Sequence, residues 1–374
     1  MTRRAPLLLA IAGVLQLALP WTAPGVFLAP SLAAAAKESR PAPPIRVLPY
    51  DLRWTNEDAL LPNHARAILY ALGNTPEDLD PLRSPVVLVH GMQGDPRDLQ
   101  PVVDHLSRSL RQRDRETSYQ LYILAYADYQ ACASENGQAF AEELQRLATS
   151  LAWRHRLTIV AHSLGGIVAR DALNILAAHS LPEEFSSVLL VAIDSPWHGY
   201  RGPADRGLGK LLMRVARPFL APGLEELRAE SALFLGDDRE GHSPRGLLRT
   251  LLPSQIEIKL VFAQEGAEVM DYTEGVLQQL VPLLLRHYRD DQAVSAEPRV
   301  MNFYHALVSA QPYFALQDEL RRLADAGLLN VTAVRHALLR HYPRFPGNHM
   351  TVLDEHVGQY SLLDYLAAEL DEAR

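Results

Sequence analysis

Ser163 stands between a short apolar run and a helix-forming run, in the segment Leu157–Gly166, whose sequence is LTIVAHSLGG. This strand–turn–helix context is typical of a serine nucleophile, which a sharp and strained turn presents to the substrate. Such a turn needs small residues on both sides of the serine. Ala161 and Gly165 meet this need, although alanine stands where a first glycine is usual. Because a serine hydroxyl is a poor nucleophile at neutral pH, the segment also predicts a general base nearby.

Histidine is the side chain best suited to be that base, because its unperturbed pKa of about 6.5 lets it accept a proton at neutral pH. A carboxylate then holds the ring in the right tautomer and stabilises the imidazolium. Among 14 histidines, His349 is the predicted base, because it lies late in the chain in a Pro-Gly turn, FPGNHMTVL at Phe345–Leu353. Two neighbouring histidines suit the role less well. His341 precedes the turn, and His356 is expected on the helix that follows it.

The elements that must position Ser163 and His349 alternate between strands and helices. Short apolar runs predict buried strands, and amphipathic stretches predict helices. Strands are expected at 86–89, 119–126, 157–162, 188–193 and 256–263, and helices at 56–72, 97–113, 134–152, 164–178 and 352–370. This alternation predicts an α/β fold with a mostly parallel sheet and right-handed crossovers. Residues 201–255 and 272–340 are expected to be insertions that form a helical lid or cap.

Three segments together resemble α/β-hydrolases of the bacterial lipase and esterase kind. They are Val86–Met92, Ala161–Gly166 and Ile193–Gly199, with the sequences VVLVHGM, AHSLGG and IDSPWHG. The turn at His349 is similar to the last-strand histidine segment of thioesterase domains, in which a Pro-Gly-x-His turn carries the catalytic base. The resemblance covers residues 85–200 and, locally, 343–368. It implies a catalytic triad in the chain order nucleophile, acid, base.

The acid of that triad is open between four carboxylates. Asp194 ends the strand at 188–193, which is similar to the aspartate-bearing strand of thioesterases. Glu265 and Asp271 follow the strand at 256–263, which carries the acid in most other α/β-hydrolases. Asp291 resembles the aspartate of the Asp-x-x-Val loop of bacterial lipases. We favour Asp194, because a side chain at the carboxyl end of a buried parallel strand is held rigidly beside the serine turn.

The resemblance also implies an oxyanion hole made of two backbone amides. In α/β-hydrolases one donor is the N–H that follows the His-Gly pair at the end of the strand at 86–89, which here belongs to Met92. The other is the N–H of Leu164, directly after the nucleophile. Two amides aimed at the developing negative charge would stabilise a tetrahedral intermediate. This chemistry requires no metal and no organic cofactor.

The composition excludes several other classes of function. Hydrophobic residues make up 48% of the 374 residues and charged residues 21%, as in an ordinary globular protein with a sizeable core. The formal net charge is −8, and no basic stripe opposes it, which argues against nucleic acid as a partner. The single Cys132 rules out an intrachain disulfide and fits no zinc pattern.

Residues 1–36 are typical of a secretory signal. Arg3 and Arg4 precede the apolar run Leu7–Leu19, and the small residues at Ser31–Ala36 offer a cleavage site. An uncleaved membrane anchor is the alternative, because the apolar character continues beyond the run. Residues 37–55 are expected to be a proline-rich linker, and 56–374 to be the hydrolase domain. We therefore expect a periplasmic or secreted protein.

Together these features predict an exported serine hydrolase that cleaves carboxylic esters, lipid or acyl esters among them, through an acyl-serine intermediate. A lipid substrate would bring the protein into contact with a membrane surface. A thioesterase or acyltransferase using the same triad is the alternative within this class. A non-catalytic binding module on the same fold is the alternative of another class, and the presence of both Ser163 and His349 argues against it.

Overall fold

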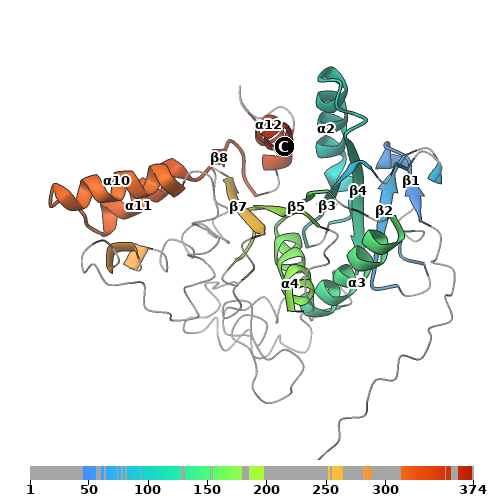
Figure 1. Cartoon of the computed structure of the whole chain (residues 1–374), viewed down its shortest axis with the longest axis horizontal. Coiled ribbons are helices and arrows are strands. Elements are labelled where there is room, and N and C mark those ends of the chain that lie inside the picture. Colours follow the sequence, from blue (N-terminus) through green and yellow to red (C-terminus); the bar gives the residue numbers. More distant parts are fainter. Residues whose placement is uncertain are drawn as a thin grey trace, which may run out of the picture. The chain divides into compact units, whose positions relative to one another are not determined.

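A computed structural model of the chain (Figure 1) describes residues 45–55, 60–127, 131–178, 185–197, 252–263, 281–288, 313–354 and 361–372, with shorter gaps inside several of these ranges. The chain divides into two units, residues 1–42 and 43–374. All of the described residues lie in the second unit.

Within the described residues, eight strands form one sheet in the order β1-β2-β4-β3-β5-β6-β7-β8. The strands are β1 (Val47–Leu48), β2 (Ala67–Leu72), β3 (Ser84–Val89), β4 (Tyr119–Tyr126), β5 (Leu157–His162), β6 (Val188–Ile193), β7 (Ile256–Ala263) and β8 (Arg344–Phe345). Only the β2–β4 pair is antiparallel among these strands, and every other neighbouring pair is parallel. The fold class predicted from the sequence is confirmed.

The described helices are α2 (Gln100–Gln112), α3 (Ala133–Leu151), α4 (Leu164–Ala178), α10 (Tyr313–Asp325), α11 (Val331–His341) and α12 (Leu362–Glu372). Three short 3₁₀ helices, η1 (Leu52–Trp54), η4 (Pro96–Leu99) and η7 (Thr351–Leu353), complete the described elements. None of the described helices is long and apolar enough to span a membrane.

Both faces of the sheet are buried, which explains the nearly continuous apolar runs of the strands. In β5, Leu157 and Ile159 point into one core, whereas Val160 points into the other. Helices α3 and α4 cover the first core, and α2 and α12 cover the second (Figure 1). The sheet is therefore the middle of three layers, and its strand ends are held from both sides.

The pairing register brings the ends of β5 and β6 together. His162 pairs with Ile193, so that the next residues, Ser163 and Asp194, leave neighbouring strands at the same edge of the sheet. On the other side of β5, Ala161 pairs with Val89 near the end of β3. Three strand ends that carry candidate site residues therefore lie next to one another.

The helix predicted over residues 56–72 is wrong for its last part, where the structure has β2. A short apolar run is ambiguous between a buried helix and a buried strand, because its periodicity does not separate them. Here all six residues of β2 are buried, and the strand pairs with both β1 and β4. Part of the expected linker also belongs to the fold, since Leu52 of η1 is fully buried.

The helix predicted over residues 352–370 begins later than expected. The structure has the short helix η7 and then α12, which begins at Leu362. Ser361 precedes α12 and caps it, because its Oγ accepts from the Asp364 N–H at 3.2 Å while the Asp364 carboxylate accepts from the Ser361 N–H at 3.1 Å. The lid expected at 201–255 lies almost entirely outside the described residues. In the insertion expected at 272–340, the described helical residues lie in α10, in α11 and between 281 and 288.

Candidate active site

Ser163 lies on a strained turn between β5 and α4. Its φ is +53°, in the left-handed region that L-residues other than glycine rarely adopt. The turn is held in place by backbone hydrogen bonds. The Ser163 N–H donates to the Ile193 carbonyl oxygen at 2.8 Å, and the Gly166 N–H donates to the Ser163 carbonyl oxygen at 3.0 Å. A strained serine that its surroundings hold in this way is a feature of functional sites.

Close packing explains the small residues around this serine. A Cβ on Gly165 would lie 2.4 Å from the His90 carbonyl oxygen, and one on Gly166 would lie 2.0 Å from Ser195 Oγ. Both distances are too short for any real contact. The glycines therefore let α4 begin directly against the ends of β3 and β6.

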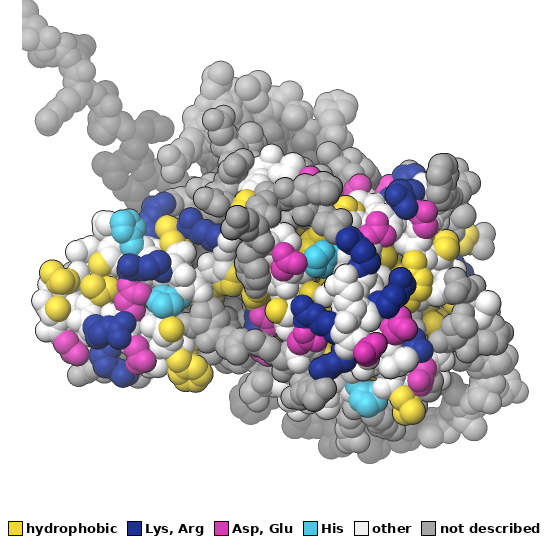
Figure 2. Space-filling model, turned by 90° about the horizontal axis from the view of Figure 1, so that it is seen from above, with side chains coloured by type: hydrophobic (Ala, Val, Ile, Leu, Met, Phe, Trp, Pro, Cys, Tyr) yellow, Lys and Arg dark blue, Asp and Glu magenta, His cyan; other side chains and the backbone are white. Residues whose placement is uncertain are grey.

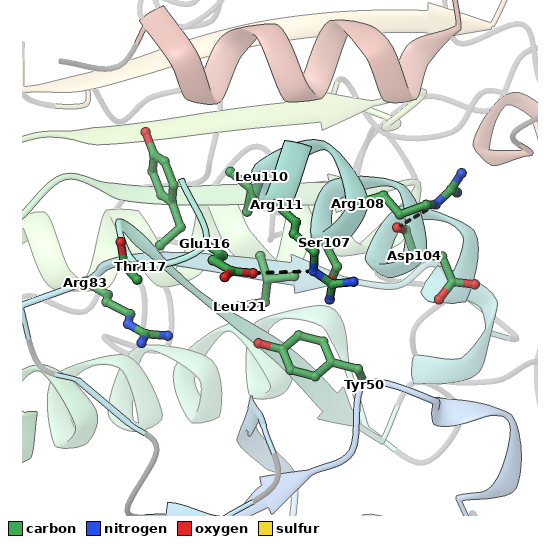
Figure 3. Close-up of a pocket in the computed structure, with 11 residues that line it drawn as sticks. Tyr50, Arg83, Asp104, Ser107, Arg108, Leu110, Arg111, Glu116, Thr117 and Leu121 are labelled. Carbon is green, nitrogen blue, oxygen red and sulfur yellow. Dashed lines mark hydrogen bonds and ion pairs between the residues drawn. The ribbon is translucent and has the colours of Figure 1, made fainter. Parts of the chain in front are cut away.

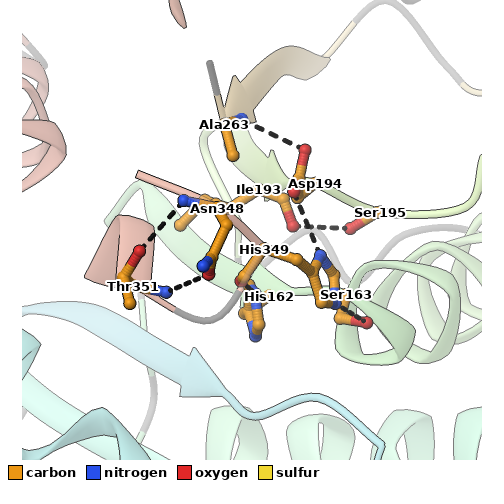
Figure 4. Close-up of polar contacts among 9 residues, drawn as sticks. All are labelled: His162, Ser163, Ile193, Asp194, Ser195, Ala263, Asn348, His349 and Thr351. Atoms are coloured by element: carbon orange, nitrogen blue, oxygen red, sulfur yellow. Dashed lines mark hydrogen bonds and ion pairs between the residues drawn. The ribbon is translucent and has the colours of Figure 1, made fainter. Parts of the chain in front are cut away.

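His349 connects Ser163 to Asp194, as Figure 4 shows. The His349 Nε2 atom lies 2.9 Å from Ser163 Oγ, and its Nδ1 atom lies 3.0 Å from Asp194 Oδ2. Ser163 and Asp194 are buried, whereas the His349 side chain is 17% exposed. Both distances are within hydrogen-bond reach, so the three side chains have the geometry of a nucleophile, a base and an orienting carboxylate.

The turn that carries His349 is braced by its neighbours. The Asn348 N–H donates to Thr351 Oγ1 at 2.9 Å, and the Thr351 N–H donates to Asn348 Oδ1 at 3.0 Å (Figure 4). Gly347 adopts a φ of +109°, which only glycine tolerates without strain. These two hydrogen bonds between Asn348 and Thr351 therefore fix the turn on both sides of His349.

Asp194 is also held in an unusual backbone conformation. Its φ is +48°, its N–H donates to the Val261 carbonyl oxygen at 2.8 Å, and its Oδ1 accepts from the Ala263 N–H at 3.1 Å. One carboxylate oxygen is thus tied to β7, which leaves Oδ2 for His349. This arrangement fixes the direction of the carboxylate as well as its position.

Met92 and Leu164 are the predicted donors of an oxyanion hole. Met92 and Ser163 line one cavity, together with His90 and Gly91, at the end of β3. Leu164 is the first residue of α4, whose N-terminal N–H groups carry a partial positive charge. The role of their two N–H groups as oxyanion donors stays a prediction.

The cavity at Ser163 has a volume of about 260 Å³. It is lined by His90, Gly91, Met92, Gly94, Asp98, Leu99, His162, Ser163, His349, Thr351, Leu353 and Asp354. Burial lowers the pKa of His90 to about 4. Burial, and secondly the charge of His349, lower the pKa of His162 to about 4 as well. Both rings are therefore neutral at neutral pH.

His90 is also fixed by contacts with its neighbours. Its ring stacks on that of Tyr126 with centroids 4.2 Å apart, and its Nδ1 lies 2.9 Å from the Gly91 carbonyl oxygen. The Tyr126 hydroxyl donates to the His90 carbonyl oxygen at 2.8 Å. These contacts hold the chain just before Met92, and the sequence offered only the His-Gly pair as a sign of them.

The other candidates for the acid and the base are not brought to this cavity by the described structure. Glu265, Asp271, Asp291 and His356 lie outside the described residues. His341 is the last residue of α11, and its Nε2 lies 2.6 Å from Glu319 of α10. It therefore makes a side-chain contact between two helices, outside the cavity.

A second and larger cavity, of about 670 Å³, lies at the amino ends of β3 and β4 (Figure 3). Its lining includes Arg83, Arg111 and Glu116. Arg111 Nε lies 3.4 Å from the Glu116 carboxylate, and Arg83 Nε lies 4.0 Å from that of Asp80. On the face shown in Figure 2, basic and acidic side chains are likewise interspersed. This cavity has no serine nucleophile with an adjacent histidine among its lining residues.

The strand order with an antiparallel β2, and a strained serine between β5 and α4, define the fold as that of the α/β-hydrolases. Residues 84–265, a little less than half of the chain, match the family described as "Putative serine esterase (DUF676)". That segment, from β3 to just beyond β7, is similar to a family whose description names serine esterases. No curated protein matches the chain at a significant level.

Several solved structures are similar in fold. The propeptide form of the Bacillus licheniformis lipase BlEst2 is 16% identical, with a TM-score of 0.36, over 53% of this chain and 40% of that one. A "putative esterase" from Staphylococcus aureus is 11% identical, with a TM-score of 0.41, over 82% and 84%. Phospholipase PlaB from Legionella pneumophila is 18% identical, with a TM-score of 0.33, over 49% and 39%. Identities and scores this low carry no information about substrate.

Proposed function

We propose that this protein is a serine hydrolase that cleaves carboxylic esters through an acyl-serine intermediate. The observation that carries the proposal is the pair of hydrogen bonds made by His349, to Ser163 Oγ at 2.9 Å and to Asp194 Oδ2 at 3.0 Å. The match to a serine esterase family supports the same reaction class.

In the first half of the reaction, Ser163 Oγ attacks the ester carbonyl carbon while His349 Nε2 takes the hydroxyl proton. Asp194 stabilises the resulting imidazolium, and the N–H groups of Met92 and Leu164 donate to the oxyanion. When the tetrahedral intermediate collapses, the bond to the alcohol oxygen breaks. The alcohol then leaves with the proton from His349, and the acyl group remains on Ser163.

In the second half, a water molecule attacks the acyl carbonyl carbon while His349 takes one of its protons. Collapse of this intermediate breaks the bond to Ser163 Oγ, which recovers its proton from His349. The carboxylic acid is released, and the enzyme returns to its starting state. The same groups could also act as an acyltransferase or a thioesterase. An acyltransferase differs in the acceptor, which is an alcohol in place of water, and a thioesterase differs in the leaving group, which is a thiol.

A fluorophosphonate probe tests the reaction class, because it labels only an activated serine. We expect the purified chain to be labelled at Ser163, and the Ser163→Ala variant to remain unlabelled. A panel of p-nitrophenyl esters of increasing chain length, matched thioesters and phospholipid vesicles then identifies the substrate, with esters expected to turn over fastest. An unlabelled parent protein that is correctly folded would favour the binding module instead.

We further propose that the substrate is a lipid or acyl ester and that the protein is exported. The proposal for export is supported by the arginine pair, apolar run and small-residue site in residues 1–36. Fractionation of a bacterial host expressing the full chain, followed by N-terminal sequencing, tests it. We expect a shortened chain outside the cytoplasm. A chain beginning at Met1 in the cytosolic fraction contradicts export, and a full-length chain in the membrane fraction identifies the anchor.

A further inference from the structure

His162 is the last residue of β5, directly before Ser163, and it contacts the base. Its Nε2 atom lies 2.7 Å from the backbone carbonyl oxygen of His349. The rings of the two histidines lie 4.7 Å apart, centroid to centroid, with an angle of 34° between their planes. The side chain before the nucleophile therefore reaches the backbone and the ring of a residue 187 positions later in the chain (Figure 4).

The other side of the His162 ring faces the chain before Met92. A Cβ on Gly91 would lie 3.1 Å from His162 Nδ1 and 2.9 Å from Ser163 Cβ. Only a residue without a side chain can thus follow His90 while the ring stays in place. The imidazole fills the space between the turn of the base and the segment that leads to the oxyanion amide of Met92.

The chemistry of the contact determines the tautomer of His162. A carbonyl oxygen only accepts, so the ring proton must be on Nε2 for the hydrogen bond to His349 to exist. The ring is 5% exposed, and burial together with the charge of His349 lowers its pKa to about 4. His162 therefore remains a neutral donor at neutral pH, and it adds no positive charge next to His349.

We propose that His162 is a positioning residue that holds the backbone of the base, so that the His349 ring stays directed at both Ser163 and Asp194. This inference rests on the proposed function. Ser163 and Asp194 leave paired strands, whereas the His349 turn approaches them from a distant part of the chain. The described contacts that brace this turn from within are those of Asn348 and Thr351, and His162 ties it to the strand that carries the nucleophile.

The experiment compares three substitutions that differ in what they offer to the His349 carbonyl. In His162→Gln the amide nitrogen can take the place of Nε2. In His162→Asn the amide is one methylene shorter and cannot reach, and in His162→Met the donor is absent. A ring displaced by about 1 Å can reduce the rate by about 100-fold. We expect His162→Asn and His162→Met to lower kcat by about 10- to 100-fold with KM within about twofold, and His162→Gln to retain kcat within about fivefold.

A matched control is His105→Met, because His105 lies on α2, 3.4 Å from Asp364 of α12, and takes no part in the site. It should retain the parent kcat. Equal kcat values for the parent, His162→Asn and His162→Met would overturn the inference, as would equal losses in all three variants accompanied by equal losses in melting temperature. If His162→Met does not fold, the difference in kcat between His162→Gln and His162→Asn still shows whether the hydrogen-bond donor is needed. A parent chain that neither turns over esters nor reacts with the probe rejects the proposed function itself.

Discussion

Two cavities at opposite ends of β3 differ in size, in charge and in backbone strain. The cavity of about 670 Å³ at the amino end is lined by Arg83 and Arg111, which pair with carboxylates, and by Arg108, which donates to the Asp104 carbonyl oxygen. The side chains of Arg111 and Glu116 are 72% and 60% exposed. The cavity of about 260 Å³ at the carboxyl end is lined by Ser163 and by three histidines, of which His90 and His162 are almost fully buried. The larger cavity is thus a solvated groove, and the smaller one holds polar groups that the fold keeps from water.

Stored strain and desolvation, rather than volume, are what distinguish the candidate site from the larger cavity. Ser163 and Asp194 have φ values of +53° and +48°, and such conformations cost about 1 to 3 kcal/mol each. Strain alone is insufficient, since Asp114 also has a φ of +53°. Asp114 follows the end of α2, where the Arg115 N–H bonds to the Leu110 carbonyl oxygen at 2.7 Å, and a left-handed residue is usual there. At the serine turn no helix end explains the strain.

Of all the variants in either cavity, Ser163→Ala in the smaller one should lose the most activity. Loss of a nucleophile that acts together with its base typically lowers kcat by about a millionfold. Steady-state hydrolysis of the best ester by purified protein measures it, with circular dichroism to show that the fold is intact. Retention of more than about a tenth of the activity would reject Ser163 as the nucleophile.

His349→Ala should be nearly as damaging, because the serine loses the group that takes its proton. His341→Ala is the matched control, since His341 pairs with Glu319 on the neighbouring helix α10. The control should keep most of the activity in the same assay. If His356→Ala proves to be the inactive variant instead, the base has been misplaced.

Asp194→Asn should lower kcat by about 10⁴-fold, as loss of the correct histidine tautomer does in a serine protease. Asparagine tolerates a positive φ, so the strained backbone at this position can be kept. The rival acids supply the controls, and Asp291→Asn, Asp271→Asn and Glu265→Gln should each stay within about tenfold of the parent. A loss of thousands-fold in one of these three, with Asp194→Asn active, would transfer the role of the acid.

Acid should lower the free energy of unfolding, because His90 and His162 of the smaller cavity are buried as neutral rings. In the folded chain their pKa values are about 4, against an ordinary value of 6.5. Between these pH values the unfolded chain binds protons that the folded chain does not, so stability falls as the pH falls from 6.5 to 4. The loss is about 3 kcal/mol for each histidine. Urea unfolding at several pH values measures it, and His162→Gln should show a shallower dependence on pH.

The smallest effect should come from Arg111→Ala in the larger cavity. The ion pair of Arg111 with Glu116 is solvent-exposed, and pairs of this kind contribute little. We expect kcat within about twofold and a free energy of unfolding within about 0.5 kcal/mol of the parent. A loss of activity of tenfold or more would show that the two ends of β3 are coupled, and the contrast between the cavities would then fail.

The sequence by itself predicted the features that depend on neighbouring residues. The apolar run at 157–162 and the small residues Ala161 and Gly165 predict a strand that ends in a tight turn, and β5 and Ser163 have this form. The helix expected at 164–178 is α4 with the same bounds. At 56–72, apolar residues at roughly helical spacing predicted a helix, and the pairing of β2 with β4 decided otherwise for residues 67–72.

The tertiary structure alone decided which distant groups meet. Four carboxylates were candidates for the acid in the sequence, and the contact between Asp194 Oδ2 and His349 Nδ1 joins residues 155 positions apart. The contact of His162 with the His349 carbonyl has no signal in either segment. Sequence patterns report local conformation and burial, whereas such distances depend on strand order and register. The sequence therefore predicted most of the elements that carry the candidate site. The packing of the sheet determined the geometry of that site.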